Sequence, residues 1–425
     1  MRPVPRPFPR DQGALTRQVM GLTPRSLEAP LPTGMRDRLP HEAEARRALV
    51  GRVLERARSW GYELIEPPSF EFASVLERGL PGGEGADVLR FVEPESGEVA
   101  ALRPDVTPQV ARILATRMRH EEPPLRLAYV ANVVRRAGSA SAARREVAQC
   151  GVELAGPSGP LGYLELIALA DELVAREGVA RPTLDLGDAL VLDELLAQVP
   201  VALRSALHQA IDRRDVRAVE ELAPKLPDGI GETLVMLLGL DDDPSAIQVA
   251  RPALEPWPTA VAALTRLEAL VALARGAGLT SRLRVDLTTL RGFSYYTGTT
   301  FQIFAAGADE AIVSGGRYDS LVARYGRELP SSGFAIDLER LARLSTVSIQ
   351  AARLRVAVVG EGAFTAAKAL RDAGLVAVHG DAASDADAAF VLDGESFTRR
   401  SSGMRIFAEK PVEALLAHLR SAAFG

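Results

Sequence analysis

Residues 125–154, LRLAYVANVVRRAGSASAARREVAQCGVEL, decide the fold of this chain. Apolar and polar residues alternate toward both ends of the stretch, and this pattern predicts strands at Leu125–Val134 and Glu146–Leu154. The residues between the strands are mostly small, and a pair of arginines stands on either side of them. The stretch therefore predicts a long β-hairpin with a small, flexible tip.

The second strand of this hairpin carries polar residues on one face. Side chains in a strand alternate between two faces, so Gln149, Gly151 and Glu153 share one of them. Gly151 has no side chain, which lets a ligand approach the sheet. Asp105 and Thr107 add oxygen acceptors at the end of another predicted strand. Together these groups suit an ammonium ligand, whereas a solvated polar face explains any single strand taken alone.

Two further clusters contain residues that suit ligand binding. The guanidinium of Arg291 suits a carboxylate, and the adjacent Tyr295 and Tyr296 suit a planar ring through stacking and hydroxyl hydrogen bonds. Adjacent tyrosines in a strand are also common at the edge of a core. Gly315–Asp319, with sequence GGRYD, and Gly333–Leu341 form the other cluster. A glycine turn before a helix can bind an anion, but paired glycines more often mark a simple turn.

Helical patterns surround these clusters. Apolar residues at helical spacing predict an amphipathic helix over His41–Trp60. Thr107 followed by Pro108 matches an N-cap before the first helical residue and predicts a helix over Gln109–Arg119.

The ends and the middle of the chain differ in composition from the rest. Residues 1–30 are rich in Pro, Arg and Gly without periodicity, which predicts a disordered tail. From about 188 to 275 nearly every segment has a helical period, which predicts a helical insertion. Strand and helix patterns alternate again over 353–425 and predict a small α/β domain.

Composition excludes several classes of function. Cys150 is the only cysteine and the five histidines lie far apart, so we expect no disulfide, no metal centre and no cofactor. None of the three lysines lies in a phosphate-binding Gly-Lys-Ser/Thr loop. No apolar run reaches the roughly 18–20 residues that span a bilayer, and the N-terminus lacks the apolar stretch of a secretory signal. We therefore expect a cytoplasmic protein, and the net charge of −5 argues weakly against a dedicated nucleic-acid-binding protein.

Taken in order, the segments resemble the core of class II aminoacyl-tRNA synthetases. Gly61–Phe70 resembles the first signature motif, Val133–Glu153 the second and Gly333–Leu341 the third. Arg291–Tyr296 and Gly315–Asp319 resemble two segments specific to histidyl-tRNA synthetase. Five motifs in the right order make chance similarity very improbable.

The resemblance covers residues 31–345 and implies an α+β fold. The expected core is a class II synthetase-like antiparallel sheet of six or seven strands, flanked by helices, with the helical insertion at about 188–275. The small α/β domain at 353–425 would then be a degenerate anticodon-binding-like domain.

The resemblance also assigns roles to individual residues. It implies a histidine-binding site formed by Asp105, Thr107, Gln149, Glu153, Arg291, Tyr295 and Tyr296. The first four would hold the α-amino group, Arg291 the carboxylate and the tyrosines the imidazole. Arg135 and Arg340 fall where the family's arginines bind the phosphates of ATP.

Several positions depart from the synthetase pattern on the ATP side. Ala137 replaces a usual glutamate, Asp337 replaces a glycine in the third motif, and Ser294 replaces an aspartate. A carboxylate at 337 would repel phosphate if it faces the pocket. The segment 380–387 is acidic where the family has a basic helix, so tRNA is not an expected partner. These departures imply a chain without catalytic residues, in which Arg135 and Arg340 are vestigial.

The sequences of Leu102–Arg112 and Gln149–Gly156 resemble those of a non-aminoacylating branch of the family, the regulatory subunits of ATP phosphoribosyltransferase. The resemblance implies a subunit required for the first step of histidine biosynthesis and for feedback inhibition by L-histidine. It implies a homodimer through the class II core, paired with a short catalytic subunit. An active histidyl-tRNA synthetase is the alternative, and another histidine- or nucleotide-binding paralogue is a third.

Overall fold

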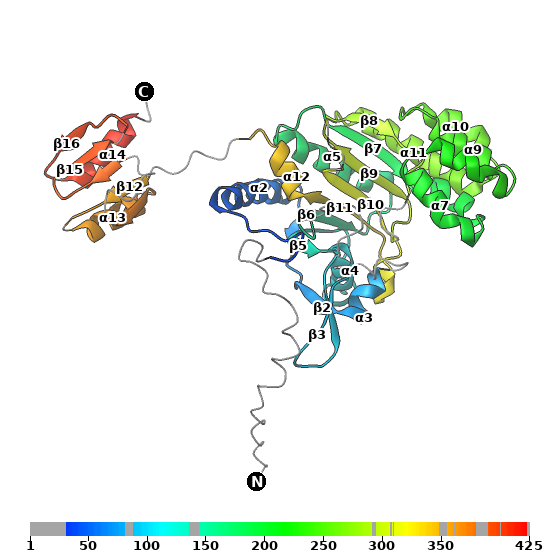
Figure 1. Ribbon diagram of the computed structural model, residues 1–425, viewed down its shortest axis with the longest axis horizontal. Helices are drawn as coiled ribbons and strands as arrows, with labels where there is room; N and C mark the ends of the chain where they lie inside the picture. Colours follow the sequence, from blue (N-terminus) through cyan, green and yellow to red (C-terminus); the bar gives the residue numbers. More distant parts are fainter. Residues whose placement is uncertain are drawn as a thin grey trace, which may run out of the picture. The chain divides into compact units, whose positions relative to one another are not determined.

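The computed structural model describes residues 31–80, 88–135, 144–290, 295–306, 308, 310–347, 355–360, 362–379, 390–399 and 401–422. The chain divides into two compact units, Met1–Thr346 and Val347–Gly425 (Figure 1). The predicted tail at 1–30 lies outside the described residues.

A mixed sheet forms the centre of the first unit. Its eight strands follow the order β1-β5-β6-β11-β10-β9-β7-β8. The outer pairs β1–β5 and β7–β8 are parallel, and all other pairs are antiparallel. The expectation of six or seven strands is wrong, because short parallel strands extend both edges. The bounds are β1 Glu63–Leu64, β5 Leu125–Val134, β6 Glu146–Ala155, β7 Thr183–Asp188, β8 Arg282–Val285, β9 Thr299–Phe304, β10 Val313–Arg317 and β11 Ser331–Asp337.

The predicted hairpin is confirmed as β5 and β6 at the middle of this sheet. Strand β6 pairs with β5 on one side and with β11 on the other. Glu153 stands opposite Gly333 of β11, and Gln149 stands opposite Asp337. This register brings the second and third sequence motifs side by side.

Helices cover one face of the sheet (Figure 1). Leu49, Val53 and Ala57 recur at helical spacing and bury one side of α2. They share the main core with Cys150, Val152 and Leu154, which point to this face of β6. The helices here include α2 Pro40–Ser59, α5 Pro160–Arg176 and α12 Leu338–Leu344.

Helix α4 and a small sheet pack against the other face, around Tyr129 and Val133 of β5. The small sheet has the strand order β2-β4-β3. The bounds are β2 Phe70–Phe72, α3 Ala73–Leu76, β3 Arg90–Val92, β4 Val99–Leu102 and α4 Thr107–Thr116, with 3-10 turns at Glu77–Gly79 and Ala323–Tyr325.

The predicted helical insertion is confirmed between β7 and β8. Its buried apolar residues join the core that the sheet shares with α2 and α5. The bounds are α6 Leu190–Ala197, α7 Val201–Asp212, α8 Val216–Leu222, a 3-10 turn at Ala223–Lys225, α9 Ile230–Leu238, α10 Ala246–Leu254 and α11 Pro258–Gly276.

The second unit is a small α/β domain, as expected. Its sheet has the order β13-β12-β14-β15-β16, with β12 parallel to both neighbours. The acidic segment 380–387 lies outside the described residues. The bounds are β12 Arg355–Val358, α13 Ala363–Asp372, β13 Val376–His379, β14 Phe390–Leu392, β15 Ser396–Arg399, β16 Arg405–Phe407 and α14 Pro411–Ala422.

Two local expectations are wrong. Val106, not Thr107, is the N-cap of α4, and no side chain caps this helix, which ends at Thr116. Gly315 and Gly316 do not form a turn but pair with both neighbours inside β10. Neighbouring aromatic rings explain why these positions are glycines. A Cβ added to Gly315 would lie 2.4 Å from the ring of Phe301, and one added to Gly316 would lie 2.5 Å from the ring of Tyr296.

Candidate functional site

A cavity of about 150 Å³ lies over β6, β10 and β11 at the start of α4. Most residues proposed from the sequence line it, namely Asp105, Thr107, Arg135, Gln149, Tyr295, Tyr296 and Arg340. Glu153 lies beside it, next to Gly333 of its lining. Arg291 lies outside the described residues.

One end of the cavity is acidic. Glu153 is 2 % exposed and Asp105 is 3 % exposed. Thr107 Oγ1 donates to Glu153 Oε1 at 2.8 Å, and the hydroxyl of Tyr318 donates to Oε2. The Tyr295 hydroxyl donates to Asp105 Oδ2 at 2.6 Å. No Arg, Lys or His of the described segments forms an ion pair with either carboxylate.

This environment disfavours the charged form of Glu153. Burial is the largest cause and raises the pKa of its carboxyl well above the usual range. The hydrogen bond from Thr107 opposes this shift, whereas the neighbouring Asp105 charge adds to it. A bound cation would favour the ionised form of Glu153, so the acidic end of the cavity suits a cationic ligand.

Glycines give the acidic end its room. A Cβ on Gly333 would lie 1.7 Å from Glu153 Oε2, so only glycine permits this carboxylate to lie over β11. The expected role of Gly151 is wrong in its detail. A Cβ there would meet the Tyr129 ring at 2.4 Å, so the glycine accommodates that ring and not a ligand.

Gln149 contributes an unsatisfied polar atom to the cavity. Its side chain is 8 % exposed, and its Oε1 atom has no hydrogen-bond partner. Buried polar atoms are nearly always paired, so an orphaned acceptor on a cavity wall indicates a missing donor. An ammonium group supplies three such donors.

The other end of the cavity carries arginines that are already paired. Asp337 Oδ2 lies 2.7 Å from Arg144 Nη2 and 3.2 Å from Arg340 Nε. Arg340 also pairs with Glu310 and donates to the carbonyl of Ala311 at 2.8 Å. Arg135 Nε donates to the carbonyl of Pro104 at 3.0 Å.

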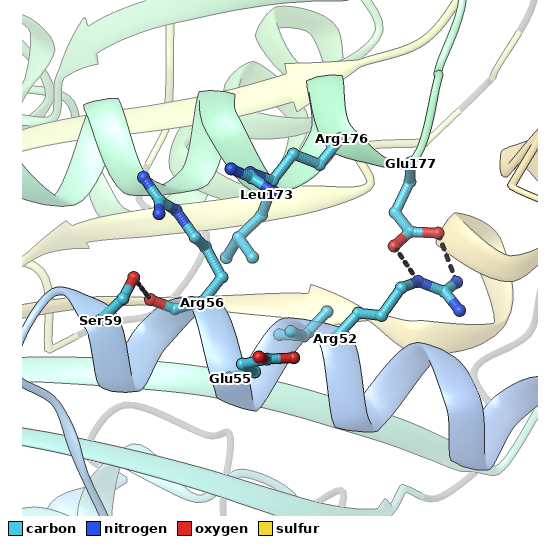
Figure 2. A pocket seen from close by; sticks show the side chains of 8 residues that line it. Arg52, Glu55, Arg56, Ser59, Leu173, Arg176 and Glu177 are labelled. Carbon is cyan, nitrogen blue, oxygen red and sulfur yellow. Dashed lines mark hydrogen bonds and ion pairs between the residues drawn. The ribbon is translucent and has the colours of Figure 1, made fainter.

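A larger cavity of about 390 Å³ lies between α2 and α5 (Figure 2). Arg52 forms a bidentate ion pair with Glu177 there, in which Nε donates to Oε1 at 2.8 Å and Nη2 donates to Oε2 at 2.7 Å. Arg56 and Arg176 both pair with Glu172. These arginines have carboxylate partners within the protein, in contrast to the carboxylates of the acidic end.

Tyr318 contributes to the site although no pattern in the sequence pointed to it. Its ring is buried, meets Tyr295 edge-on at 5.8 Å between centroids, and its hydroxyl holds Glu153. Tyr318 was visible inside the GGRYD segment, but its role depends on the pairing of β10 with β11. Tyr129 was missed for the same reason, since the pairing of β5 with β6 places its ring against Gly151.

Two other properties bear on function. Over the described ranges, no cluster of three or more His, Cys, Asp or Glu side chains could hold a metal ion. Likewise, no helix among those described is long and apolar enough to cross a bilayer.

Comparison with known proteins agrees with this fold. The family described as histidyl-tRNA synthetase matches residues 34–341. A crystal structure described as an ATP phosphoribosyltransferase regulatory subunit/histidyl-tRNA synthetase from Bacillus halodurans C superposes with a TM-score of 0.76 at 25 % identity, covering 87 % of this chain and 99 % of that one. Fold and motifs together define a histidyl-tRNA synthetase-like protein of class II.

Curated relatives narrow the assignment. The ATP phosphoribosyltransferase regulatory subunit of Moorella thermoacetica is 36 % identical over 386 residues, or 89 % of this chain and 96 % of the relative. That of Anaeromyxobacter dehalogenans is 39 % identical over 320 residues, or 74 % and 90 %. The chain belongs to the ATP phosphoribosyltransferase regulatory subunit family. The Moorella match exceeds the 346 residues of the first unit and so extends into the second.

Proposed function

We propose that this chain is a non-catalytic regulatory subunit of ATP phosphoribosyltransferase that binds L-histidine and relays feedback inhibition in histidine biosynthesis. One observation carries the proposal: two buried carboxylates, Asp105 lining a tyrosine-walled cavity and Glu153 beside it, form no ion pair with any Arg, Lys or His of the described residues. The family of the chain supports the regulatory role.

The functional groups of histidine match the residues of this cavity. Its α-ammonium group supplies donors for Glu153, Asp105 and the orphaned Oε1 of Gln149. The imidazole would lie against Tyr295 and Tyr296, which are buried and contact each other edge-on. Arg291 remains the proposed partner of the ligand carboxylate.

The arginine end of the cavity supports the proposed lack of catalysis. Amino-acid activation needs cations free to hold the phosphates of ATP. Asp337 pairs with Arg144 and Arg340, so those charges are already neutralised. The cavity would therefore bind the amino acid without activating it.

Regulation requires a partner and two assembly states. We propose a short catalytic subunit, lacking a regulatory domain of its own, as that partner. Histidine must bind the active and the inhibited assemblies with different affinity, since equal affinity would shift no equilibrium.

A homodimer through the class II core is part of the proposal. Phe70, Phe72 and Phe91 share one face of the small sheet and are 47, 41 and 37 % exposed. Phe70 and Phe91 pack edge-on with centroids 5.2 Å apart. An aromatic face of this kind favours burial against a second copy.

Reconstitution tests the function directly. We expect the purified chain to restore phosphoribosyl transfer to a short catalytic subunit and to make that activity sensitive to histidine. The chain alone should show no histidine-dependent exchange between ATP and pyrophosphate. Such exchange would instead establish a histidyl-tRNA synthetase, and failure to stimulate the catalytic subunit would contradict the regulatory role.

A further inference from the structure

Three arginines gather at one end of the ligand cavity. Arg135 and Arg340 line it, and Arg144 lies against Asp337, which also lines it. The charges of Arg144 and Arg135 both act on Arg340, whose pKa is lowered first by burial and then by these neighbours. A cluster of like charges this close requires a compensating anion.

Asp337 supplies that negative charge from within the chain. Its side chain is 10 % exposed, and Oδ2 lies between Arg144 Nη2 at 2.7 Å and Arg340 Nε at 3.2 Å. Its Oδ1 accepts hydrogen bonds from the backbone N–H groups of Glu339 at 3.0 Å and Arg340 at 3.1 Å. The carboxylate is thus the N-cap of α12 and the counter-ion of the arginines at once.

Asp337 lies next to Gln149, which faces the proposed amino-acid site at the acidic end of the cavity. It is the last residue of β11 and stands directly opposite Gln149 of β6. Residues opposite each other in such a pair project to the same face with their Cβ atoms about 5 Å apart. A ligand that reached from Gln149 toward the arginines would therefore meet this carboxylate first.

We propose that Asp337 determines the specificity of the cavity by occupying the place of an anion among Arg135, Arg144 and Arg340. A phosphate entering this end would face a buried negative charge and arginines that are already paired. The cavity then accepts an amino acid and rejects phosphate-bearing ligands such as nucleotides. This inference rests on the proposed function, because it explains how the site binds histidine without activating it.

The substitution Asp337→Asn isolates the charge. Asparagine is an equally good N-cap and has the same shape, so α12 keeps its start. Arg144 and Arg340 lose the carboxylate they share and keep only their separate partners Glu339 and Glu310. We expect calorimetry to detect no binding of MgATP or pyrophosphate to the full-length wild-type chain at ligand concentrations up to about 1 mM. D337N should bind these ligands with a dissociation constant at least about tenfold below that limit of about 1 mM. Histidine affinity should stay within about twofold, since the acidic end is untouched.

Glu310→Gln is the matched control. Glu310 also pairs with Arg340, but its side chain is 66 % exposed, so solvent screens its charge. This variant should leave the binding of both phosphate ligands at the wild-type level. A gain in E310Q equal to that in D337N would overturn the assignment of specificity to Asp337.

Measuring phosphate-ligand binding and histidine binding separately distinguishes the failure of this inference from the failure of the proposed function. Wild-type binding of MgATP or pyrophosphate as tight as that of D337N overturns the role of Asp337, as does a D337N protein that melts normally and gains no anion affinity. Should D337N fold poorly, wild-type binding alone decides: none supports the role and measurable binding overturns it. Absence of histidine binding in the wild type contradicts the proposed function and not the role of Asp337.

Discussion

Glu153 is the residue on which the proposed recognition of histidine depends. It is buried, hydrogen-bonded by Thr107 and Tyr318, and has a raised pKa. A protonated carboxyl favours the unliganded state, whereas an ammonium ligand favours the carboxylate. Ligand binding and proton release are therefore coupled at this side chain.

Glu153→Gln tests this coupling. We expect histidine affinity to fall about 10- to 100-fold, because a charge-assisted hydrogen bond contributes about 1.5–3 kcal/mol. In the wild type, histidine affinity should rise with pH as Glu153 loses its proton, and binding should release a proton, measured by calorimetry in buffers of different ionisation enthalpy. E153Q should show no proton release. Glu172→Gln on α5 is the control and should leave both quantities unchanged.

At the residue scale, alternation along a strand predicted which side chains of β6 face the cavity, because that pattern is local. The predicted N-cap role of Thr107 was wrong, because its hydroxyl bonds to Glu153, a residue 46 positions away in sequence. Tyr318 was missed because strand pairing, and not neighbouring sequence, brings it to the same carboxylate.

Helix α12 is the element that holds the arginine end in place. Glu339 in its first turn receives hydrogen bonds from Arg144 and from Arg38, whose Nε lies at 3.0 Å. Burial opposes ionisation, but the bonds from these two arginines lower the pKa of Glu339 to about 2. The carboxylate thus ties the N-terminal segment before α2 to the start of α12.

Glu339→Gln should weaken this connection. A lowered carboxyl pKa adds stability that is complete above the unfolded-state value of about 4.3 and is lost as pH falls toward about 2. We expect the variant to unfold with a free energy roughly 2 kcal/mol lower at neutral pH, since Arg38 and Arg144, both half-buried, each lose one carboxylate partner. Urea unfolding should show this difference narrowing below about pH 4. A difference independent of pH would contradict the ion-pair explanation.

Elements with strong local patterns could be predicted from the sequence. The β5–β6 hairpin and the helices of the insertion follow from periodicity alone. The place of Gly315 and Gly316 inside β10 could not be predicted, because only the rings of Phe301 and Tyr296 packed against them explain the paired glycines.

At the scale of the whole molecule, all described residues of the candidate site lie in the first unit. The same unit carries the aromatic face of the small sheet. Recognition of the ligand and the proposed self-association therefore belong to one compact body, and the resemblance that predicted its fold covers nearly all of it.

Phe72→Asp tests self-association through this face. A buried charge opposite an aromatic partner is costly, so the variant should elute as a monomer where the wild type elutes as a dimer in light-scattering chromatography. Val201→Asp is the control, because Val201 is 78 % exposed on the insertion, away from the small sheet. Dimers that persist in F72D would place the interface elsewhere.

Gly151, Gly316 and Gly333 belong to three strands of the central sheet, and each leaves room for a side chain from elsewhere. The sheet therefore forms the base of the proposed amino-acid recess, while Asp105, Tyr295 and Tyr296 enclose it from segments next to the strands. Even a single methyl group at Gly333 would block the carboxylate beside it. The shape of this base depends on residues that have no side chain, so a substitution at a position that never contacts the ligand would close the recess.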